Sequence, residues 1–284
     1  MIIIKKIIYI ITLLLALALL TSCIGKTDIP FFTTKPAETA STEPLTVTIA
    51  FPEGFTVVQI AERLEENKVC SASEFIALTN NAEYIQTLGY SFTDFITNID
   101  QRAFHLEGYI FPDTYEFYKG ESAERALRRF LDNTELKITA KYKQRAEELG
   151  FTIDEIITLA SIVQKESYTR DSVNNVASVL HNRLESSSFS RLQCDVTIHY
   201  INDFVTNSKY LTDTTSDFAS AYNTYKCYGL PAGPICNPGL ASIEAALYPA
   251  ETDYYYFVTD SDWNYYYSST YDQHKAKCRE LGLM

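Results

Sequence analysis

The segment 152–166 constrains folding more than any other part of this 284-residue chain. Thr152 followed by Glu155 is a capping-box pattern, which predicts that a helix begins here. Apolar residues then recur at the spacing of one helix face, at Ile156, Leu159, Ala160 and Val163. The next position on this face is Glu166. The sequence therefore predicts a core-facing helix that ends in a carboxylate.

A carboxylate on the buried face of a helix is costly unless it is paired, hydrogen-bonded or protonated. Burial raises the pKa of such a group, and a carboxyl group with a raised pKa can act as a general acid near neutral pH. Two structural explanations compete, because Glu166 can also reach solvent at the helix end or pair with Arg170. Periodicity alone favours the structural explanations, so other features of the chain are needed to choose.

The first 23 residues have the pattern of a targeting segment. Basic residues precede an apolar run over residues 7–20, as in a secretory signal. The run ends in Leu-Thr-Ser-Cys, which resembles a bacterial lipobox and implies a lipid on Cys23. The alternative is an uncleaved single span that extends through Ile24, because a spanning helix needs roughly 20 apolar residues. Both alternatives anchor the protein at the cell membrane, with its body on the outer side.

Four parts are expected along the chain. Residues 1–23 are the signal or anchor, and residues 24–44, rich in Thr, Pro and Ser, form a flexible linker. Residues 45–117 show the order strand, helix, helix, strand and resemble a LysM-like peptidoglycan-binding module; an ordinary α+β subdomain without a ligand is the alternative. Residues 118–284 form a larger domain, which makes the predicted fold class α+β.

Periodicity and capping signals predict the elements of the folded part. Helices are expected at 56–67, 71–79, 122–149, 152–166, 172–184, 240–247 and 270–281. Strands are expected at 45–49, within 103–117, and in a hairpin formed by 254–258 and 265–269. The stretch 80–102 is expected to be rich in loops.

Charge and cysteine content exclude several classes of partner and site. The net charge of −12 argues against nucleic acid or anionic lipid as the main partner. The chain has no CxxC pair and its four histidines are scattered, so no metal site is expected. Cys227 and Cys236 flank a Gly/Pro loop and are the candidate pair for a disulfide bridge.

Six motifs occur in the order in which they occur in one known family. They are LEGYIFPDTYEF, LASIVQKES, VASVLHNRL, LQCDVTIHY, YNTYKCYGLPAGPICNPGLASIEAAL and YYYFVTD. Together they resemble the MltG/YceG-like endolytic murein transglycosylases over nearly all of the folded chain. The resemblance implies a membrane-anchored enzyme without a cofactor, whose catalytic domain faces the wall and cleaves nascent peptidoglycan glycan strands, limiting their length. It also implies an association with wall-synthesis enzymes.

The catalytic glutamate of the family falls on Glu166, within Lys165-Glu166-Ser167. Many relatives carry a second glutamate where this chain has Gln164, so Glu166 is the only residue of this run that can donate a proton. Near the C-terminus, relatives often show Gly-His-x-Phe-Ser. This chain has Asn-Tyr-Tyr-Tyr-Ser at 264–268, so any role of that histidine is absent here.

A lytic transglycosylase needs only one carboxyl group, whereas hydrolases use two. Glu166 is expected to protonate the oxygen between N-acetylmuramic acid and N-acetylglucosamine. It then takes the proton of the muramic C6 hydroxyl, which closes on C1 to give a 1,6-anhydro end. Two alternatives remain: a muramidase-type hydrolase that uses Asp195 as second carboxylate, and a non-catalytic wall-binding scaffold.

Six residues are expected to bind substrate, namely Gln193, Asp195, Asn223, Tyr225, Glu107 and Tyr109. Gln193 and Asn223 suit hydrogen bonds to sugar hydroxyl or N-acetyl groups, with capping of local backbone as the alternative for each. Asp195 can orient the substrate or stabilise positive charge. Glu107 and Tyr109 belong to the LEGY motif and are expected to line the cleft, unless that motif only packs the two modules together.

Overall fold

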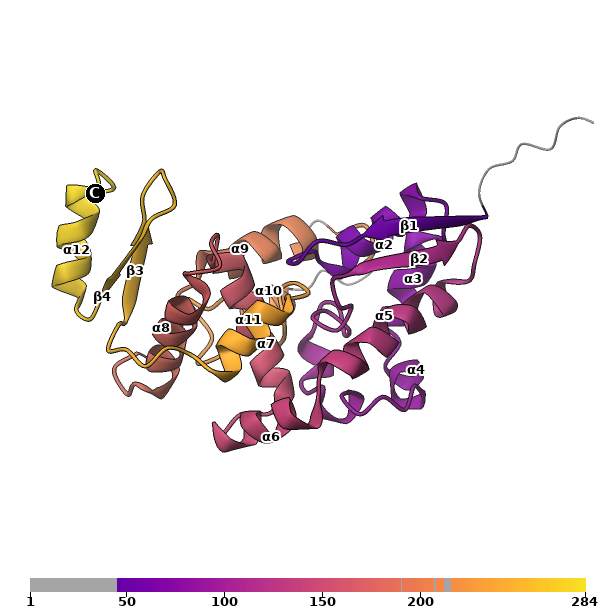
Figure 1. Ribbon diagram of the computed structural model, residues 1–284, viewed down its shortest axis with the longest axis horizontal. Helices are drawn as coiled ribbons and strands as arrows, with labels where there is room; N and C mark the ends of the chain where they lie inside the picture. The colour runs from indigo at the N-terminus through magenta and orange to yellow at the C-terminus, as the bar shows by residue number, and fades with distance from the viewer. Residues whose placement is uncertain (1–44, 190, 207, 212–215) are drawn as a thin grey trace, which may run out of the picture. The chain divides into compact units, whose positions relative to one another are not determined.

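The computed structural model describes residues 45–189, 191–206, 208–211 and 216–284 (Figure 1). The fold class is α+β, as predicted, with many helices and two separate two-stranded antiparallel sheets among the described residues. None of the helices in these ranges has the length and apolar character of a bilayer-spanning segment. The predicted anchor, Cys23 and the predicted linker lie outside the described residues.

The first sheet pairs two strands that lie far apart in the sequence. Its elements are β1 (Thr46–Ala50), α2 (Val57–Glu66), α3 (Ala72–Thr79) and β2 (Thr114–Tyr118). Thr46 lies opposite Tyr118 in the antiparallel register. Helix α2 begins with a capping box from Thr56, so its start follows from local hydrogen bonding. The two predicted strands and the first two helices are confirmed, but a third helix and two short 3-10 turns stand between α3 and β2.

Helices make up most of the remaining structure. They are α4 (Ala82–Thr87), α5 (Ala123–Lys137), α6 (Ala140–Glu148), α7 (Ile153–Glu166), α8 (Val173–Glu185), α9 (Asp195–Tyr200), α10 (Ser216–Tyr222), α11 (Leu240–Leu247) and α12 (Tyr271–Glu280). A π-helical turn, Ile201–Thr206, follows α9 directly. The predicted hairpin is confirmed as β3 (Tyr256–Thr259) and β4 (Tyr265–Ser268), against which α12 packs (Figure 1).

Two regions differ from the sequence prediction. The single helix expected over 122–149 is two helices, because the backbone leaves the helical region at Ile138 (ψ 78°) and Thr139 caps a new helix. The stretch 80–102 contains α4 and two short 3-10 turns, Thr93–Phe95 and Ile99–Gln101. The side chain of Asn81 starts α4 by accepting a hydrogen bond from the Tyr84 amide.

The predicted disulfide bridge is wrong. All five cysteines of the described part are free, including Cys227 and Cys236. The thiol of Cys236 is buried and lies 3.4 Å from the carbonyl oxygen of Ser161 on α7. This cysteine therefore packs the Gly/Pro loop against the helix without a covalent link.

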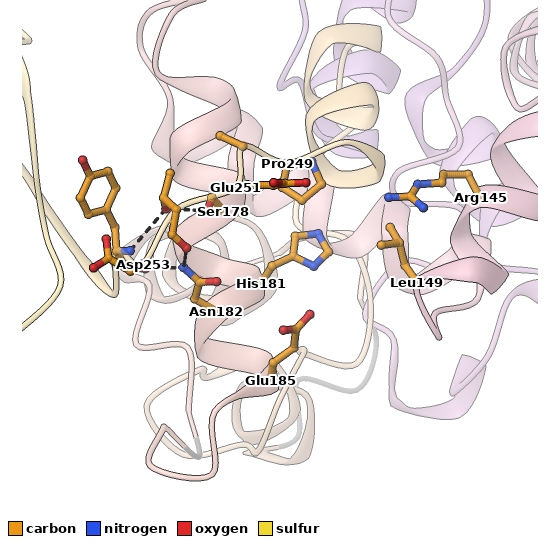
Figure 2. A pocket seen from close by; sticks show the side chains of 12 residues that line it. Arg145, Leu149, Ser178, His181, Asn182, Glu185, Pro249, Glu251 and Asp253 are labelled. Atoms are coloured by element: carbon orange, nitrogen blue, oxygen red, sulfur yellow. Dashed lines mark hydrogen bonds between the residues drawn. The ribbon is translucent and has the colours of Figure 1, made fainter.

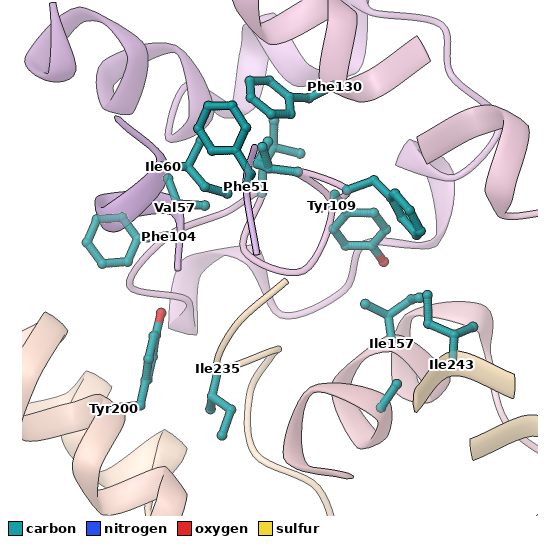
Figure 3. Close-up of a cluster of buried hydrophobic side chains, with 14 of the residues drawn as sticks. Phe51, Val57, Ile60, Phe104, Tyr109, Phe130, Ile157, Tyr200, Ile235 and Ile243 are labelled. Atoms are coloured by element: carbon teal, nitrogen blue, oxygen red, sulfur yellow. The ribbon is translucent and has the colours of Figure 1, made fainter. Parts of the chain in front are cut away.

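Helix α7 is the element on which the other motifs converge. Its capping box between Thr152 and Glu155 forms as predicted, and its apolar stripe is buried completely. It packs against α6, α8, α9 and α11. Figure 3 shows Ile157 of this helix near Tyr109 of the LEGY motif and Ile243 of α11. Because packing surrounds the helix, the position of its last residue is set by the core.

A close backbone contact joins the LEGY motif to the Gly/Pro loop. Gly108 has a φ of +90°, and a Cβ atom there would lie 2.5 Å from Cγ of Pro234 and 2.9 Å from Cγ2 of Ile157. Only glycine fits this backbone conformation and this separation. The LEGY motif, the Gly/Pro loop and α7 therefore meet at one point.

Buried hydrogen bonds reinforce this junction. Oε1 of Glu107 accepts from the Val57 amide (2.9 Å) and from Nδ2 of Asn237 (3.0 Å). Oδ1 of Asn237 accepts from the Ile110 amide at 2.8 Å, and its Nδ2 also donates to the Phe55 carbonyl at 2.9 Å. Glu107 and Asn237 thus join the start of α2, the LEGY motif and the Gly/Pro loop.

The substitution Gly108→Ala tests the close contact. It should lower the free energy of unfolding by about 3 kcal/mol or more, because it combines a left-handed backbone with overpacking. Gly120→Ala is the matched control, since Gly120 also has a positive φ (+73°) but no atom within 4 Å of its added Cβ. The control should lose only about 1 kcal/mol. Chemical denaturation measures both, and equal losses would contradict the packing argument.

Candidate active site

Glu166 is the last residue of α7, and its side chain is partly buried. Within the described ranges its carboxyl group has no hydrogen bond and no ion pair. The sequence alternative of a pair with Arg170 is therefore not seen, and Arg170 is exposed. The helix end holds an acid without a direct partner.

The surroundings of Glu166 favour its protonated form. The pKa of the carboxyl is raised from 4.5 to about 7, chiefly by burial and also by the charge of Asp195, while the charge of Arg183 opposes the shift. Burial acts because it penalises the charged form, and a like charge adds to the penalty. About half of the Glu166 side chains are then protonated at neutral pH, which suits a general acid.

Asp195 and Tyr225 lie beside Glu166. Asp195 is the first residue of α9 and is exposed, and its Oδ1 accepts a hydrogen bond from the Tyr225 hydroxyl at 2.6 Å. Burial and this bond raise the pKa of Tyr225 to about 12. The carboxylate of Asp195 is thus held in place through Oδ1, while its other oxygen has no donor among the described residues. These two predicted residues are brought together with Glu166.

Thr224 joins the segment that carries Asp195 to the segment that carries Tyr225. Its carbonyl accepts from the Gln193 amide (3.1 Å), and its hydroxyl accepts from the Cys194 amide (2.9 Å). Gln193 itself is exposed, with a left-handed φ of 55°. Oδ1 of Asn223 accepts from the Tyr225 amide at 3.0 Å, which is the local backbone capping considered as the alternative for this residue. Gln193 therefore has an exposed side chain two residues before Asp195, whereas the side chain of Asn223 is hydrogen-bonded to its local backbone.

Glu107 and Tyr109 lie elsewhere, and both are completely buried. Besides the bonds described above, Oε2 of Glu107 lies 3.3 Å from the Tyr200 hydroxyl. The Tyr109 hydroxyl donates to Oδ1 of Asp154 at 2.6 Å, and Asp154 also pairs with Arg102. Neither residue presents a polar atom to solvent. Their placement corrects the expectation that they line the cleft and favours the packing alternative.

Arg183 holds the loop next to Glu166. Its Nε donates to the Tyr255 carbonyl at 2.7 Å, and its Nη1 donates to the Leu192 carbonyl at 2.6 Å. Helix α8 is therefore tied both to the strand region of the hairpin and to the segment that leads to Asp195. The same guanidinium is the positive charge that opposes the pKa shift of Glu166.

Tyr265 binds the main chain on both sides of Ser167, the residue that follows Glu166. Its hydroxyl donates to the carbonyl of Glu166 (2.7 Å) and accepts from the amide of Tyr168 (2.9 Å). The last carbonyls of a helix lack partners within the helix, so this bond fixes the end of α7. Sequence reasoning missed Tyr265, although it stands where relatives often have a histidine.

Gln164, two residues before Glu166, ties α7 to the start of α11. Its Oε1 accepts from the Gly239 amide and from the Ser242 hydroxyl, both at 2.9 Å. These donors belong to the start of α11, so the side chain joins two helices. An oxygen acceptor is what this position requires, and a glutamate could also supply one.

Two cavities meet at the end of α7. They have volumes of about 420 and 320 Å³ and share Glu53, Gln164, Ser167 and Tyr168 in their linings. A larger cavity, of about 660 Å³, lies between α6, α8 and residues 249–254, and its lining includes none of the predicted site residues (Figure 2). The linings of the two smaller cavities do not include Glu166 or another predicted site residue either, but they contain Gln164, Ser167 and Tyr168, which flank Glu166 in the chain. Proximity to the end of α7 therefore favours these two cavities over the larger one.

Metal chemistry has no support in the described part of the chain. No group of three or more His, Cys, Asp or Glu residues there could hold a metal ion. The side chains around Glu166 are instead a carboxylate, a guanidinium and a phenol. Such a set can transfer a proton and stabilise charge.

Comparison with known proteins gives consistent matches. The sequence profile of the YceG-like family matches residues 34–280. An endolytic murein transglycosylase of Bacillus subtilis (strain 168) is 33% identical over 234 residues, which cover 81% of this chain and 64% of the relative. One of Streptococcus pneumoniae (strain D39) is 26% identical over 251 residues, covering 84% and 45%. The chain thus spans less than two thirds of these curated relatives.

A solved structure is similar as well. The crystal structure of a putative yceG-like protein from Listeria monocytogenes aligns with a TM-score of 0.66 at 32% sequence identity. The alignment covers 81% of this chain and 75% of the other. The similarity therefore includes most of the described fold.

The raised pKa of Glu166 makes a prediction for stability. A carboxyl whose pKa is raised on folding costs stability as pH rises from its ordinary value of 4.5 through about 7. Glu166→Gln removes this cost. The variant should therefore be stabilised relative to the unsubstituted protein more at pH 8 than at pH 5. The difference between these two stabilisations should be about 1 kcal/mol, after allowance for solvent screening.

Urea denaturation at the two pH values measures this difference. Glu66→Gln, at the exposed end of α2, is the matched control. Its free energy of unfolding should differ from that of the unsubstituted protein by the same amount at both pH values. A gain for Glu166→Gln that does not change with pH would mean that the carboxyl is not desolvated.

Proposed function

Since this chain belongs to the YceG-like family, we propose that it is an endolytic lytic transglycosylase that cleaves the glycan strands of peptidoglycan. The observation that carries the proposal is the unpaired, partly buried carboxyl of Glu166, whose pKa is raised to about 7. Its curated relatives are named endolytic murein transglycosylases, which supports the same substrate.

The first step is proton donation. Protonated Glu166 gives its proton to the oxygen between N-acetylmuramic acid and N-acetylglucosamine, and the C1–O bond of the muramic residue breaks. The N-acetylglucosamine leaves with a new hydroxyl group, and positive charge develops at the muramic C1. A carboxyl group with a pKa near 7 is poised for this step at neutral pH.

The second step returns the proton. The carboxylate of Glu166 takes the proton of the muramic C6 hydroxyl, and the C6 oxygen bonds to C1 to form a 1,6-anhydro ring. The acid is restored and no water is consumed. Arg183 favours the ionised state between the two steps, because its positive charge lowers the pKa of Glu166.

Two roles in the reaction are compatible with the position of Asp195. As a charge stabiliser it faces the developing positive charge at C1, and the Tyr225 hydroxyl keeps it oriented. As a second carboxylate it would activate water, which makes the enzyme a muramidase-type hydrolase. The charge of Asp195 raises the pKa of Glu166, and this effect is compatible with both roles. Glu166 is the only acid of the LASIVQKES motif, and a mechanism with one catalytic carboxyl group favours the first role.

The remaining features of the proposal concern location and organisation. The N-terminal segment, through a lipid on Cys23 or a single span, anchors the protein to the cell membrane with its catalytic part facing the wall. Residues 45–117 act as a LysM-like module and residues 118–284 as the catalytic domain. Partners among the wall-synthesis enzymes fit an enzyme that limits the length of new strands.

Mass spectrometry of products from purified glycan strands tests the reaction. The unsubstituted protein should give 1,6-anhydro ends, and Glu166→Gln should lower the rate by about 100-fold or more, as for loss of a general acid. Gln164→Glu, the residue of many relatives, is the matched control and should stay active. Reducing ends without anhydro ends would indicate a hydrolase, and no cleavage would indicate a scaffold. Anhydro ends formed at an undiminished rate by Glu166→Gln would remove this residue from the mechanism.

Tyr265→Phe tests the positioning of the acid. Loss of the hydroxyl removes both bonds that fix the end of α7, each worth about 1 kcal/mol, so kcat should fall roughly tenfold while KM stays within about twofold. Tyr267→Phe is the control on the same strand, because its hydroxyl interacts with the Ser172 carbonyl at 3.5 Å and with Asn175, both of which lie outside α7. Tyr265→His should restore part of the rate. An unchanged kcat for Tyr265→Phe would assign the tyrosine to folding alone.

A further inference from the structure

Trp263 is the only tryptophan of the chain, and it is exposed. It lies in the turn between β3 and β4, where 49% of its surface is accessible. Its ring packs on that of Tyr168, which is 61% accessible, with centroids 4.0 Å apart and planes inclined by 39°. Two large aromatic rings exposed side by side are unusual on a soluble surface and mark binding sites.

The turn that presents Trp263 is specifically built. Trp263 has a φ of +63°, a conformation that costs a bulky residue about 1–2 kcal/mol. Its amide donates to the Asp260 carbonyl at 3.2 Å. Oδ1 of Asp260 accepts from the amides of Asp262 and Asn264, both at 2.9 Å. These bonds fix the backbone of the turn from which the indole projects onto Tyr168.

The aromatic pair is also joined to the candidate acid. Tyr168 follows Glu166 by two positions and lines both cavities at the end of α7. Its amide donates to the Tyr265 hydroxyl, which in turn donates to the Glu166 carbonyl. The pair therefore keeps a fixed position relative to the residue that is proposed to cleave the glycan.

We infer that Tyr168 and Trp263 form a sugar-binding subsite of the glycan groove, a conclusion that rests on the proposed function. The ligand is the pyranose ring of a β-1,4-linked N-acetylhexosamine. Such a ring carries its polar groups at the edge and presents a flat face of C–H groups, which packs on an aromatic ring. The subsite holds the strand next to Glu166 and takes no part in bond cleavage.

The proposal explains why these rings are exposed. An aromatic pair that served only the hairpin would be buried by it, yet each ring leaves about half or more of its surface open. A neutral sugar face also suits a protein of net charge −12, because no anionic contact is required. In the part of the chain that the structure describes, no hydrogen bond joins the other exposed tyrosines, such as Tyr118 on β2, to the end of α7.

Tryptophan fluorescence tests binding directly. With one tryptophan in the chain, the emission excited beyond the tyrosine absorption band reports on Trp263 alone. Titration with the β-1,4-linked tetramer of N-acetylglucosamine should change this emission to saturation. The Tyr168→Ala variant should need roughly five- to tenfold more tetramer for half saturation. A titration that leaves the emission unchanged would overturn the inference.

Kinetics on purified glycan strands give the second test. Trp263→Ala should raise KM roughly five- to tenfold with kcat within about twofold, and Trp263→Phe should keep most of the affinity. Tyr118→Ala is the matched control and should keep both constants, with circular dichroism checking that each variant folds. If the unsubstituted protein cleaves and Trp263→Ala keeps its KM, the subsite is wrong and the proposed function stands. If it does not cleave, the proposed function fails, and the titration still decides whether the subsite exists.

Discussion

The buried hydrogen bonds made by Glu107 and Asn237 are the interactions on which the rest of the structure depends. They join the start of α2, the LEGY motif and the Gly/Pro loop, and they span 50 to 182 positions in sequence. A buried polar group left without its partner costs about 1–3 kcal/mol, so each segment is held by the others. Gly108 brings the same loop against α7, and Tyr200 of α9 completes the set. The elements that carry the candidate acid and its neighbours are thereby fixed together.

Glu107 and Glu166 show how the surroundings of an acid decide whether it has a structural or a chemical role. Burial raises the pKa of Glu107 to about 8 and that of Glu166 to about 7. Glu107 is enclosed completely, and protein donors occupy both of its oxygens. Glu166 stands at a helix end beside open cavities, and in the described ranges its carboxyl lacks a donor. Only Glu166 is therefore free to exchange a proton with a substrate.

Sequence reasoning succeeded where the determining interactions are local. The capping box at Thr152 and the 3.6-residue period placed α7 and its final carboxylate correctly. The break at Ile138 was missed because both halves of the segment are amphipathic and neither Gly nor Pro separates them. The burial of Glu107 and the bond from Tyr265 to Glu166 depend on partners many positions away, and no local pattern reports such pairing. Family resemblance supplied the candidate acid; the structure supplied the groups that hold it.

Direct titration of the Glu166 carboxyl tests the central claim most closely. Carbon-13 labelling of the glutamate carboxyl groups, with the resonance assigned by its loss in Glu166→Gln, gives the pKa of this one group by NMR. The account predicts a midpoint near 7, shifted downward when Asp195 is replaced by Asn, because a like charge that now raises the pKa is removed. A midpoint near 4.5, unaffected by that replacement, would show that the site neither desolvates Glu166 nor prepares it as an acid.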